Sequence, residues 1–322
     1  MDSLKDYLCG ISKDVVMKYY KELLNDAMND SGLRKISAIE SNALKKCLLD
    51  IYIEVERLCN LHGLTIMLAG GSCLGAIRHK GFIPWDDDMD FLMPRPDYEK
   101  LILLLESGAM GDAYEFVYPN KKKDTICLWL QIFNKETRLI TMDGERKSFP
   151  NGCYIDIFPI DGVPSNVYRR KIKGWISNTI RLIANMVLDA KTPMNPILRS
   201  LCHADKGLKR MIYLRRFMGR LFSIVSHKRW AWWFDCYSRD FNMNGFVGVP
   251  AGRNLYFKES HQASVFFPPR KGFFEGRLVW LPNDYDKYLH ALLGDYMKIP
   301  PEEKRESHFV KEISIPKKYY SC

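Results

Sequence analysis

Two aspartates separated by one residue, Asp88 and Asp90, are the part of the sequence best suited to chemistry. They lie in DMDFLMP at 88–94, where alternating polar and apolar residues predict a β-strand that stops at Pro94. Side chains two apart in a strand emerge on one face, so the two carboxylates are expected side by side. Carboxylate oxygens suit Mg²⁺ or Mn²⁺. A solvated acidic turn is the alternative explanation of this pair taken alone.

A third carboxylate, Asp156, lies in the apolar segment CYIDIFPI at 153–160, which predicts a strand ended by Pro159 and an Asp161-Gly162 turn. A charge in such a strand is costly unless it is paired or binds a metal. A capping or turn partnership with Asp161 is the alternative. Three carboxylates from two strands predict a metal site for phosphoryl transfer. Asp86 and Asp87 lie just before the first strand. They are expected to change the electrostatic potential at the metal site or to bind water around the metal.

A glycine turn precedes these carboxylates. Gly70, Gly71 and Ser72 follow the apolar run LTIMLAGG at 64–71, which predicts a buried strand leading into a helix over 72–79. Glycines at a helix N-terminus let backbone N–H groups approach a phosphate. Most such triplets are plain turns, so this signal is weak by itself. Arg78, His79 and Lys80 come next and either hold phosphate or form a solvated helix end.

Composition narrows the class of protein. The chain has 322 residues, of which 47% are hydrophobic and 27% charged, which excludes wholesale disorder. No apolar run reaches the roughly 18 to 20 residues of a spanning helix, and the N-terminus lacks the layout of a secretory signal. Nine scattered cysteines without a C-x-x-C pair predict reduced thiols. We therefore expect a cytoplasmic protein.

The net excess of positive charge comes from one segment of the chain. The formal net charge is +10, and residues 168–240 hold sixteen Lys and Arg against four Asp and Glu, so the remainder is slightly acidic. The segment predicts amphipathic helices with interleaved basic and apolar residues. One interpretation is a solvated helical subdomain. The other is a surface that rests on anionic lipid, with Trp230, Trp232 and Trp233 at the interface. RNA binding lacks a supporting motif, and no nucleic-acid partner is expected.

These elements predict an α/β (α+β) fold in which a mixed sheet core is joined by N-terminal helices and a basic helical insert. The predicted division is 1–63 for the N-terminal helices, which Gly63 ends, 64–162 for the core, 163–245 for the insert, and 246–322 for a C-terminal region that completes the core.

The segment GGSCLGAIRHKGFIPWDDDMDF closely resembles the signature of the LicD/fukutin-related family, a branch of the nucleotidyltransferase-fold superfamily. YIDIFPIDG, FFEGRLVWLPNDYDKYL and GDYMKIPPEEKR are similar to later family segments. The resemblance covers most of the chain outside the N-terminal helices and the basic insert. One departure is LLGDYM, because many relatives have an aromatic residue before this glycine.

The resemblance implies transfer of a substituted phosphate, such as phosphocholine, from a CDP-linked alcohol to a sugar hydroxyl of a surface glycan or its lipid-linked precursor, with release of CMP. It implies that Asp88 and Asp90 are metal ligands and that Asp156 is a third ligand or the base. Donor phosphate would then contact Gly71 and Ser72. Glu275 and Arg305 also match family positions and are included as expected substrate-binding residues.

Two other classes of function remain open from the sequence. A nucleotidyltransferase would use the same carboxylates on an NTP and release pyrophosphate. A non-catalytic membrane- or RNA-binding protein would explain the basic segment but not the three aspartates. Under the phosphotransferase hypothesis, the insert is expected to hold the protein peripherally at the inner face of the cell membrane.

Overall fold

The first described helix, α3 (Ala38–His62), begins and ends where local sequence signals place it. In this computed structural model, the Ser37 side chain accepts a hydrogen bond from the backbone N–H of Glu40, and the Glu40 carboxylate accepts one from the N–H of Ser37. This capping box satisfies two N–H groups of the helix start. Gly63 ends the helix in the left-handed region, at φ 64°. The predicted end at Gly63 is confirmed, and the prediction for residues 1–31 lies outside the described residues.

The structure describes residues 32–122, 125–141, 149–194, 198–199, 202–203, 205–301, 305 and 309–320. The helices after α3 are α4 (Gly70–Arg78), α5 (Arg95–Glu106), α6 (Val167–Lys191), α8 (Lys206–Phe222), α9 (His227–Ser238), α10 (Leu255–Lys258) and α11 (Tyr285–Leu293), with short 3-10 helices η1 (Ala263–Val265) and η3 (Lys317–Tyr319). The strands are β1 (Arg34–Lys35), β2 (Met67–Leu68), β3 (Asp90–Pro94), β4 (Tyr114–Val117), β5 (Leu130–Asn134), β6 (Arg138–Thr141), β7 (Tyr154–Val163), β8 (Phe246–Gly248), β9 (Ser260–Gln262), β10 (Arg270–Phe274), β11 (Arg277–Leu281) and β12 (Phe309–Ser314).

A seven-stranded mixed sheet forms the centre of the fold. Its main path has the order β2-β3-β7-β5-β4, and β8 and β9 extend it from the far end of β7. Among the described strand pairs, β3 and β7 run parallel and the others antiparallel. Two smaller sheets, β1-β12-β6 and β10-β11, lie beside it. The predicted mixed α/β fold is confirmed.

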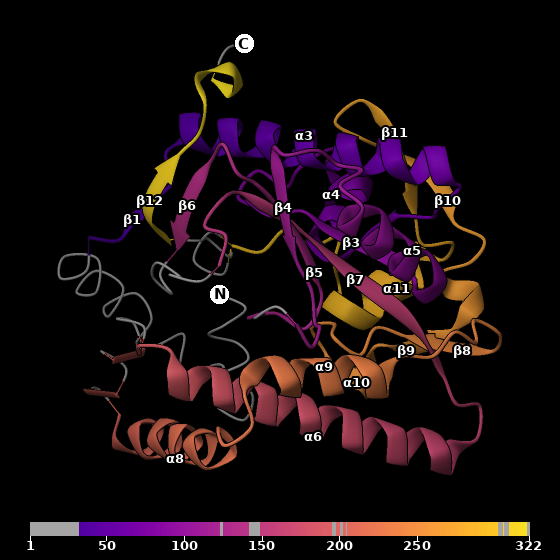
Figure 1. Ribbon diagram of the computed structural model, residues 1–322. Helices are drawn as coiled ribbons and strands as arrows, with labels where there is room; N and C mark the ends of the chain where they lie inside the picture. The colour runs from indigo at the N-terminus through magenta and orange to yellow at the C-terminus, as the bar shows by residue number, and fades with distance from the viewer. Residues whose placement is uncertain are drawn as a thin grey trace.

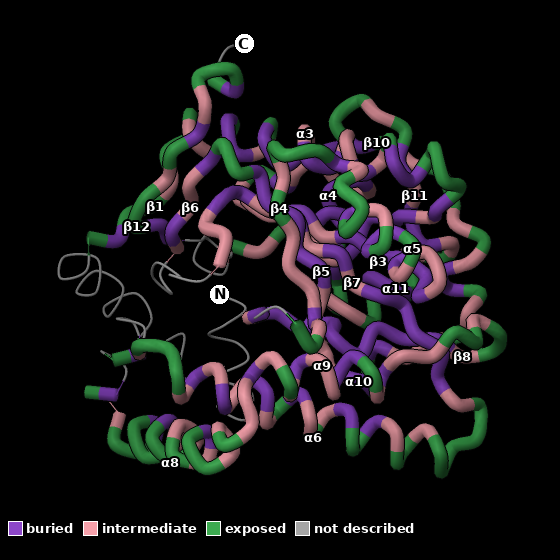
Figure 2. The backbone as a smooth tube through the Cα atoms, viewed as in Figure 1, coloured by how far each residue is buried: buried purple, intermediate pink, exposed green. Residues whose placement is uncertain are grey.

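Helices cover this sheet on opposite sides. In Figure 1, α3 crosses the top of the molecule, and α6, α8 and α9 lie along the bottom. The buried residues of α3 join those of β2, β3, β5 and β7 in one large apolar core, seen as the purple centre of Figure 2. Tyr52 of α3 stacks on Phe91 of β3 with ring centroids 4.7 Å apart. The sheet is therefore held in place by a helix that precedes it in sequence.

The strand β7 is longer than its sequence predicts. It continues through Pro159, Asp161 and Gly162, because its second half pairs with β8. The predicted strand end and the predicted turn are therefore wrong. Asp161 is fully buried and its carboxylate binds the Arg95 guanidinium, so it does not act as a turn partner of Asp156.

Two further turns shape the edges of the sheets. NKET at 134–137 turns the chain between β5 and β6, which enter different sheets and do not form a hairpin. The segment FFEGRLVWLP contains the two-residue turn Glu275-Gly276, which joins β10 and β11 in a hairpin. Both turn residues have positive φ, 49° and 72°, which is the geometry of a tight hairpin.

The basic insert folds against the sheet. Arg181 is buried and donates to the carbonyl oxygens of Pro250 and Gly252, so this cation faces inward. Trp230 and Trp233 pack edge to face, 5.0 Å between centroids, and Lys121 lies over the ring of Trp232. These three tryptophans are half-buried and contact neighbouring side chains, so they do not lie exposed as the lipid-surface interpretation requires.

A buried ion cluster joins the insert to the core. Arg95, 1% exposed, binds Asp161 of β7 through two hydrogen bonds of 2.7 and 2.8 Å. The same guanidinium donates to Asp235 of α9 at 2.8 Å and to Glu99 at 3.1 Å. Buried charges need such compensation to avoid a large desolvation cost. The cluster therefore fixes α9 on the sheet.

Candidate active site

Two of the three predicted metal ligands lie directly opposite each other on neighbouring strands. Asp90 is the first residue of β3 and is the register partner of Asp156 in the parallel strand β7. Register partners in adjacent strands project to the same face of a sheet. The backbone N–H of Asp156 donates to the carbonyl of Met89, 3.1 Å away, which extends this alignment beyond the strand. Both aspartates are half-buried.

Asp88 reaches the same region from a loop. Strand β3 begins two residues later than expected, so the argument that Asp88 and Asp90 share a strand face does not hold. The Asp88 carboxyl instead lies within hydrogen-bonding reach of Asp86. Burial, followed by the charges of Asp88 and Asp87, raises the pKa of Asp86 well above its usual value. Like charges are thus crowded together at the start of the strand.

The paired glycines make room for these carboxylates. They lie in the first turn of α4, which begins two residues before the predicted start. A Cβ atom on Gly71 would lie 2.7 Å from Oδ2 of Asp86, and one on Gly70 would lie 3.2 Å from Oδ2 of Asp90. The N-terminus of α4 therefore lies close to two carboxylates of the acidic loop and strand β3.

Two hydroxyl groups hold the start of α4 against the sheet. Ser72 is buried, and its Oγ accepts a hydrogen bond of 3.0 Å from the backbone N–H of Asp90. The phenol oxygen of Tyr288, from α11, accepts one of 3.1 Å from the N–H of Gly70. In this structure Ser72 supports the backbone of Asp90, and its contact with donor phosphate stays a prediction. Sequence reasoning missed Tyr288, which lies 218 residues after Gly70.

Asp156 is oriented by two side chains that the sequence analysis also missed. Its Oδ1 accepts hydrogen bonds of 2.7 Å from both Trp129 Nε1 and Gln131 Nε2. Gln131 is buried in β5 and is the register partner of Asp156 on that side. A buried glutamine in the apolar run LWLQIF was the available signal, because such an amide needs a partner. The two donors fix the rotamer of Asp156.

Three basic side chains gather around Trp85, the residue before the acidic loop. The guanidinium of Arg78 lies 5.9 Å from the Trp85 ring centroid and that of Arg305 lies 4.4 Å from it. His79 meets the same ring edge-on at 6.0 Å, and burial followed by the charge of Arg78 lowers its pKa. The structure thus brings together three of the predicted basic residues. Lys80 is exposed at positive φ and does not join them.

Glu275 supports this cluster from the β10-β11 turn. Its Oε1 accepts the backbone N–H of Phe82 at 3.0 Å, and its own N–H donates to the carbonyl of Lys80 at 2.9 Å. A Cβ on Gly81 would lie 2.1 Å from Oε1, so a larger residue here would displace the Glu275 carboxylate. In this structure Glu275 braces the loop that leads to Trp85, and a direct substrate contact stays a prediction.

A lysine from α3 closes the other side of the acidic loop. Lys45 Nζ donates to the carbonyl oxygens of Ile83 and Pro84 at 3.3 and 3.0 Å. Burial lowers its pKa, while the nearby charges of Asp86 and Asp87 act in the opposite direction. Sequence reasoning missed this residue, because a lysine about two turns after the start of a core helix resembles any solvated lysine.

The donor set fits a hard divalent cation in its chemistry. Asp90 and Asp156 face one another across β3 and β7, and Asp86 and Asp88 lie at the mouth of the same strands. Carboxylate oxygens are suitable ligands for Mg²⁺ or Mn²⁺, and a bound Mg²⁺ usually keeps several water ligands as well. Among the residues that the structure describes, no three His, Cys, Asp or Glu side chains already enclose an ion position. Binding would therefore draw the carboxylates together.

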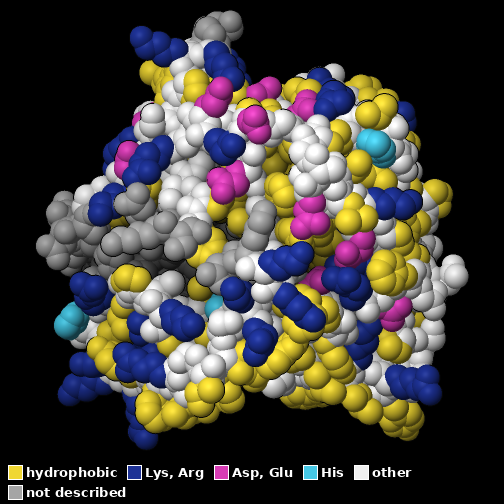
Figure 3. Space-filling model, in the orientation of Figure 1, with side chains coloured by type: hydrophobic (Ala, Val, Ile, Leu, Met, Phe, Trp, Pro, Cys, Tyr) yellow, Lys and Arg dark blue, Asp and Glu magenta, His cyan; other side chains and the backbone are white. Residues whose placement is uncertain are grey.

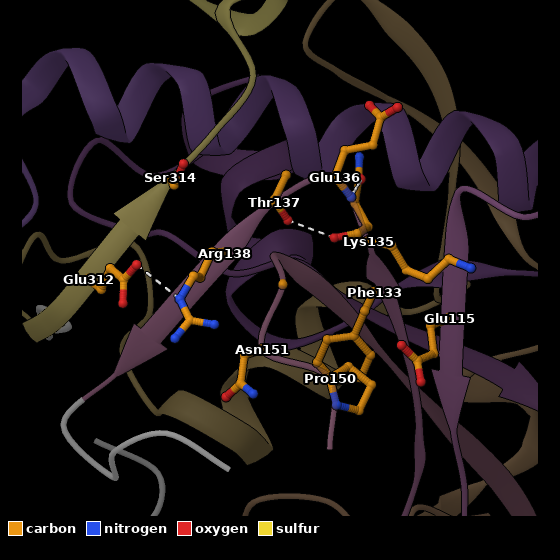
Figure 4. A pocket seen from close by; sticks show the side chains of 12 residues that line it. Glu115, Phe133, Lys135, Glu136, Thr137, Arg138, Pro150, Asn151, Glu312 and Ser314 are labelled. Carbon is orange, nitrogen blue, oxygen red and sulfur yellow. Dashed lines mark hydrogen bonds and ion pairs between the residues drawn. The ribbon is translucent and has the colours of Figure 1, made fainter. Parts of the chain in front are cut away.

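A separate hollow of about 600 Å³ lies beside β4, β5, β6 and β12. Figure 4 shows its mixed lining, in which Arg138 pairs with Glu312 at 2.9 Å and Thr137 Oγ1 donates to the carbonyl of Asn134 at 2.7 Å. None of its lining residues belongs to the acidic or basic clusters described above.

Residues 63–181, which include the aspartates of the acidic loop and Asp156, match the family described as LicD/FKTN/FKRP, nucleotidyltransferase domain. The protein carries a LicD-family nucleotidyltransferase domain. The resemblance read from the sequence is thereby confirmed.

The likeness to LicD extends beyond this domain. The chain is 26% identical over 289 residues to the lipopolysaccharide cholinephosphotransferase LicD of Haemophilus influenzae, covering 88% of this chain and 100% of that protein. It is 23% identical over 138 residues to an uncharacterized protein of Rickettsia prowazekii, covering 41% of this chain and 51% of that one. The protein is thus a distant homologue of LicD over most of its length.

Proposed function

We propose that this LicD-family protein transfers a substituted phosphate, phosphocholine or a close relative, from a CDP-linked alcohol to a sugar hydroxyl of a glycan or its lipid-linked precursor. In this reaction the hydroxyl oxygen forms a bond to the distal phosphorus, and the bond between that phosphorus and the bridging oxygen breaks. CMP leaves with the electron pair. The name and full-length coverage of the Haemophilus relative support this choice of donor and acceptor.

The juxtaposition of Asp90 and Asp156 carries the proposal. Two half-buried carboxylates in register on one sheet face, with Asp86 and Asp88 beside them, form a costly charge cluster unless it binds something cationic. We assign Asp88, Asp90 and Asp156 to Mg²⁺ or Mn²⁺, which when bound neutralises charge that develops on the phosphoryl oxygens and the leaving group.

Side chains of the protein then receive the proton of the acceptor and hold the phosphates of the donor. Asp156, held by Trp129 and Gln131, is either the third metal ligand or the base that accepts the proton of the acceptor hydroxyl. Arg78 and Arg305, on either side of Trp85, offer positive charge for the phosphates that the metal does not cover. The N–H groups at the start of α4 provide a further anion-binding surface.

A donor panel tests the proposal. The purified protein is incubated with Mg²⁺ and CDP-choline, CDP-glycerol, CDP-ribitol, CTP or ATP, and CMP and pyrophosphate are quantified. We expect CMP release from one CDP-alcohol, stopped by EDTA and lowered at least about a hundredfold by Asp90→Asn or Asp156→Asn. Asp112→Asn is the matched control, since Asp112 is exposed in the loop after α5.

The outcomes separate the candidate reactions. Pyrophosphate release from an NTP would replace this proposal with nucleotidyl transfer by the same carboxylates. Full activity of folded Asp90→Asn protein, or activity unaffected by EDTA, would refute the assigned roles.

A further inference from the structure

Two helices of the insert expose apolar side chains along a continuous stretch of surface. On α6, Ile172 is 60% and Trp175 68% exposed, and on α8 Phe217 is 53% exposed. Burying such side chains is worth about 25 cal/mol per Å², so leaving them in water is unfavourable. The exposed apolar side chains of the two helices are Val167, Tyr168, Ile172, Trp175, Ile176, Leu182, Tyr213, Leu214, Phe217 and Leu221.

Helical spacing gathers these side chains on one face of each helix. Tyr168, Ile172 and Ile176 are four residues apart, as are Tyr213, Phe217 and Leu221. The opposite face of α6 is buried, and its buried residues include Gly174, Ser177, Arg181, Ala184 and Val187. Each helix therefore has one face against the protein and a second apolar face outward.

The helix α8 covers only the second half of α6. Gly219 of α8 lies so close to the Met186 carbonyl that a Cβ would be 1.9 Å from that oxygen, and Arg215 pairs with Asp189 at 2.7 Å. Residues 167–182 of α6 lie outside this contact. The outward apolar face thus continues from the first half of α6 onto the outer side of α8.

The same surface is positively charged. Arg169, Lys171, Lys209, Arg210 and Arg220 are exposed on the two helices. Their single acidic residue, Asp189, is buried and paired with Arg215. In Figure 3, yellow apolar side chains gather along the lower edge, where Figure 1 places α6 and α8, and dark-blue cations surround α8. No acidic side chain offsets these cations on either helix.

We propose that the outward faces of α6 and α8 form a docking surface for an anionic lipid bilayer, in which the helices lie flat with Ile172, Trp175 and Phe217 among the headgroups. Apolar side chains bordered by cations are the pattern of interfacial helices. A protein partner would require acidic complementarity of unusual extent, whereas anionic headgroups supply it everywhere. Within the described residues, no helix is both long and apolar enough to cross a bilayer. The inference does not rest on the proposed reaction.

Vesicle sedimentation tests the docking surface. The full chain is mixed with phosphatidylcholine vesicles containing none or one third phosphatidylglycerol, at low and high salt. We expect binding to the anionic vesicles that weakens as salt rises. Ile172→Ser/Trp175→Ser/Phe217→Ser should lower the partition coefficient at least about tenfold. Each of Lys171→Gln and Lys209→Gln should lower it roughly fivefold, the equivalent of about 1 kcal/mol per cation.

The matched control carries three equally exposed apolar residues elsewhere. Ile39→Ser/Leu61→Ser/Leu103→Ser changes α3 and α5, and α3 lies on the opposite side of the molecule in Figure 1. Circular dichroism confirms that each variant is folded. Equal binding of both triple variants, or salt-independent binding to neutral vesicles, overturns the proposal. A dimer in lipid-free buffer that the α6-α8 variant abolishes would overturn it too, because a second copy would then be the occupant.

Discussion

Replacing Glu275 should separate stability from activity. Glu275→Gly removes the acceptor for the Phe82 N–H, which as a bond to an exposed charged group contributes about 1.5 kcal/mol. The same change relieves a left-handed backbone, φ 49°, that costs a non-glycine residue about 1 kcal/mol. The two effects nearly cancel, so we expect the free energy of unfolding to change by less than about 1 kcal/mol.

The loop behind Glu275 should nevertheless loosen. Phe82 is three residues before Trp85, around which Arg78 and Arg305 gather, and a displacement of about 1 Å at such a site can cost a hundredfold in rate. Glu275→Gly is expected to lower CMP release 10- to 100-fold and to speed hydrogen exchange at the Phe82 amide. Glu275→Gln keeps an acceptor oxygen and should behave like the parent in both assays.

The two variants distinguish the hydrogen bond of Glu275 from its charge. If Glu275→Gln lost as much activity as Glu275→Gly while the Phe82 amide stayed protected, the carboxylate charge itself would be needed and the brace would not explain the effect. If exchange at Phe82 were unchanged in Glu275→Gly, the hydrogen bond would not hold the loop.

Three further outcomes are expected. Asp90→Asn should abolish the rise in melting temperature that Mg²⁺ with a CDP-alcohol gives the parent, measured by differential scanning fluorimetry with EDTA as reference. Arg95→Met leaves Asp161 and Asp235 buried without their cation and should cost about 3 to 5 kcal/mol in urea unfolding. Burial raises the pKa of Glu259 to about 7, so its folded form holds a proton that the unfolded form releases near pH 4.5. Stability should therefore fall by about 1.4 kcal/mol per unit between pH 4.5 and 7, and Glu259→Gln should flatten this slope in urea titrations.

Local signals in the sequence predicted the parts of the fold that depend on neighbouring residues. The end of α3 at Gly63 and the apolar strand around Asp156 were predicted correctly, because helix stops and strand alternation are set within a few residues. The family resemblance then added the expected roles of the aspartates.

Partners distant in sequence explain the errors. Asp161 before Gly162 is typical of a turn, but Arg95, 66 residues earlier, draws it into the core. The clustering of Asp90 with Asp156 depends on parallel pairing, which no local pattern encodes. The orientation of Trp175 outward and Trp230 inward follows from how α6, α8 and α9 pack, which periodicity alone leaves open.

The ion cluster around Arg95 has a consequence for how this protein can be trimmed. By sequence, residues 168–240 look like a removable module, with their own charge and composition. Excising them would take away Asp235 and Arg181, leave the buried Arg95 undercompensated, and uncover the apolar side chains of Leu128 and Ala251 that pack against α6 and α9. The sheet core and the basic helices are therefore a single folding unit, and shortened versions must keep α9 and the inner side of α6 to remain folded.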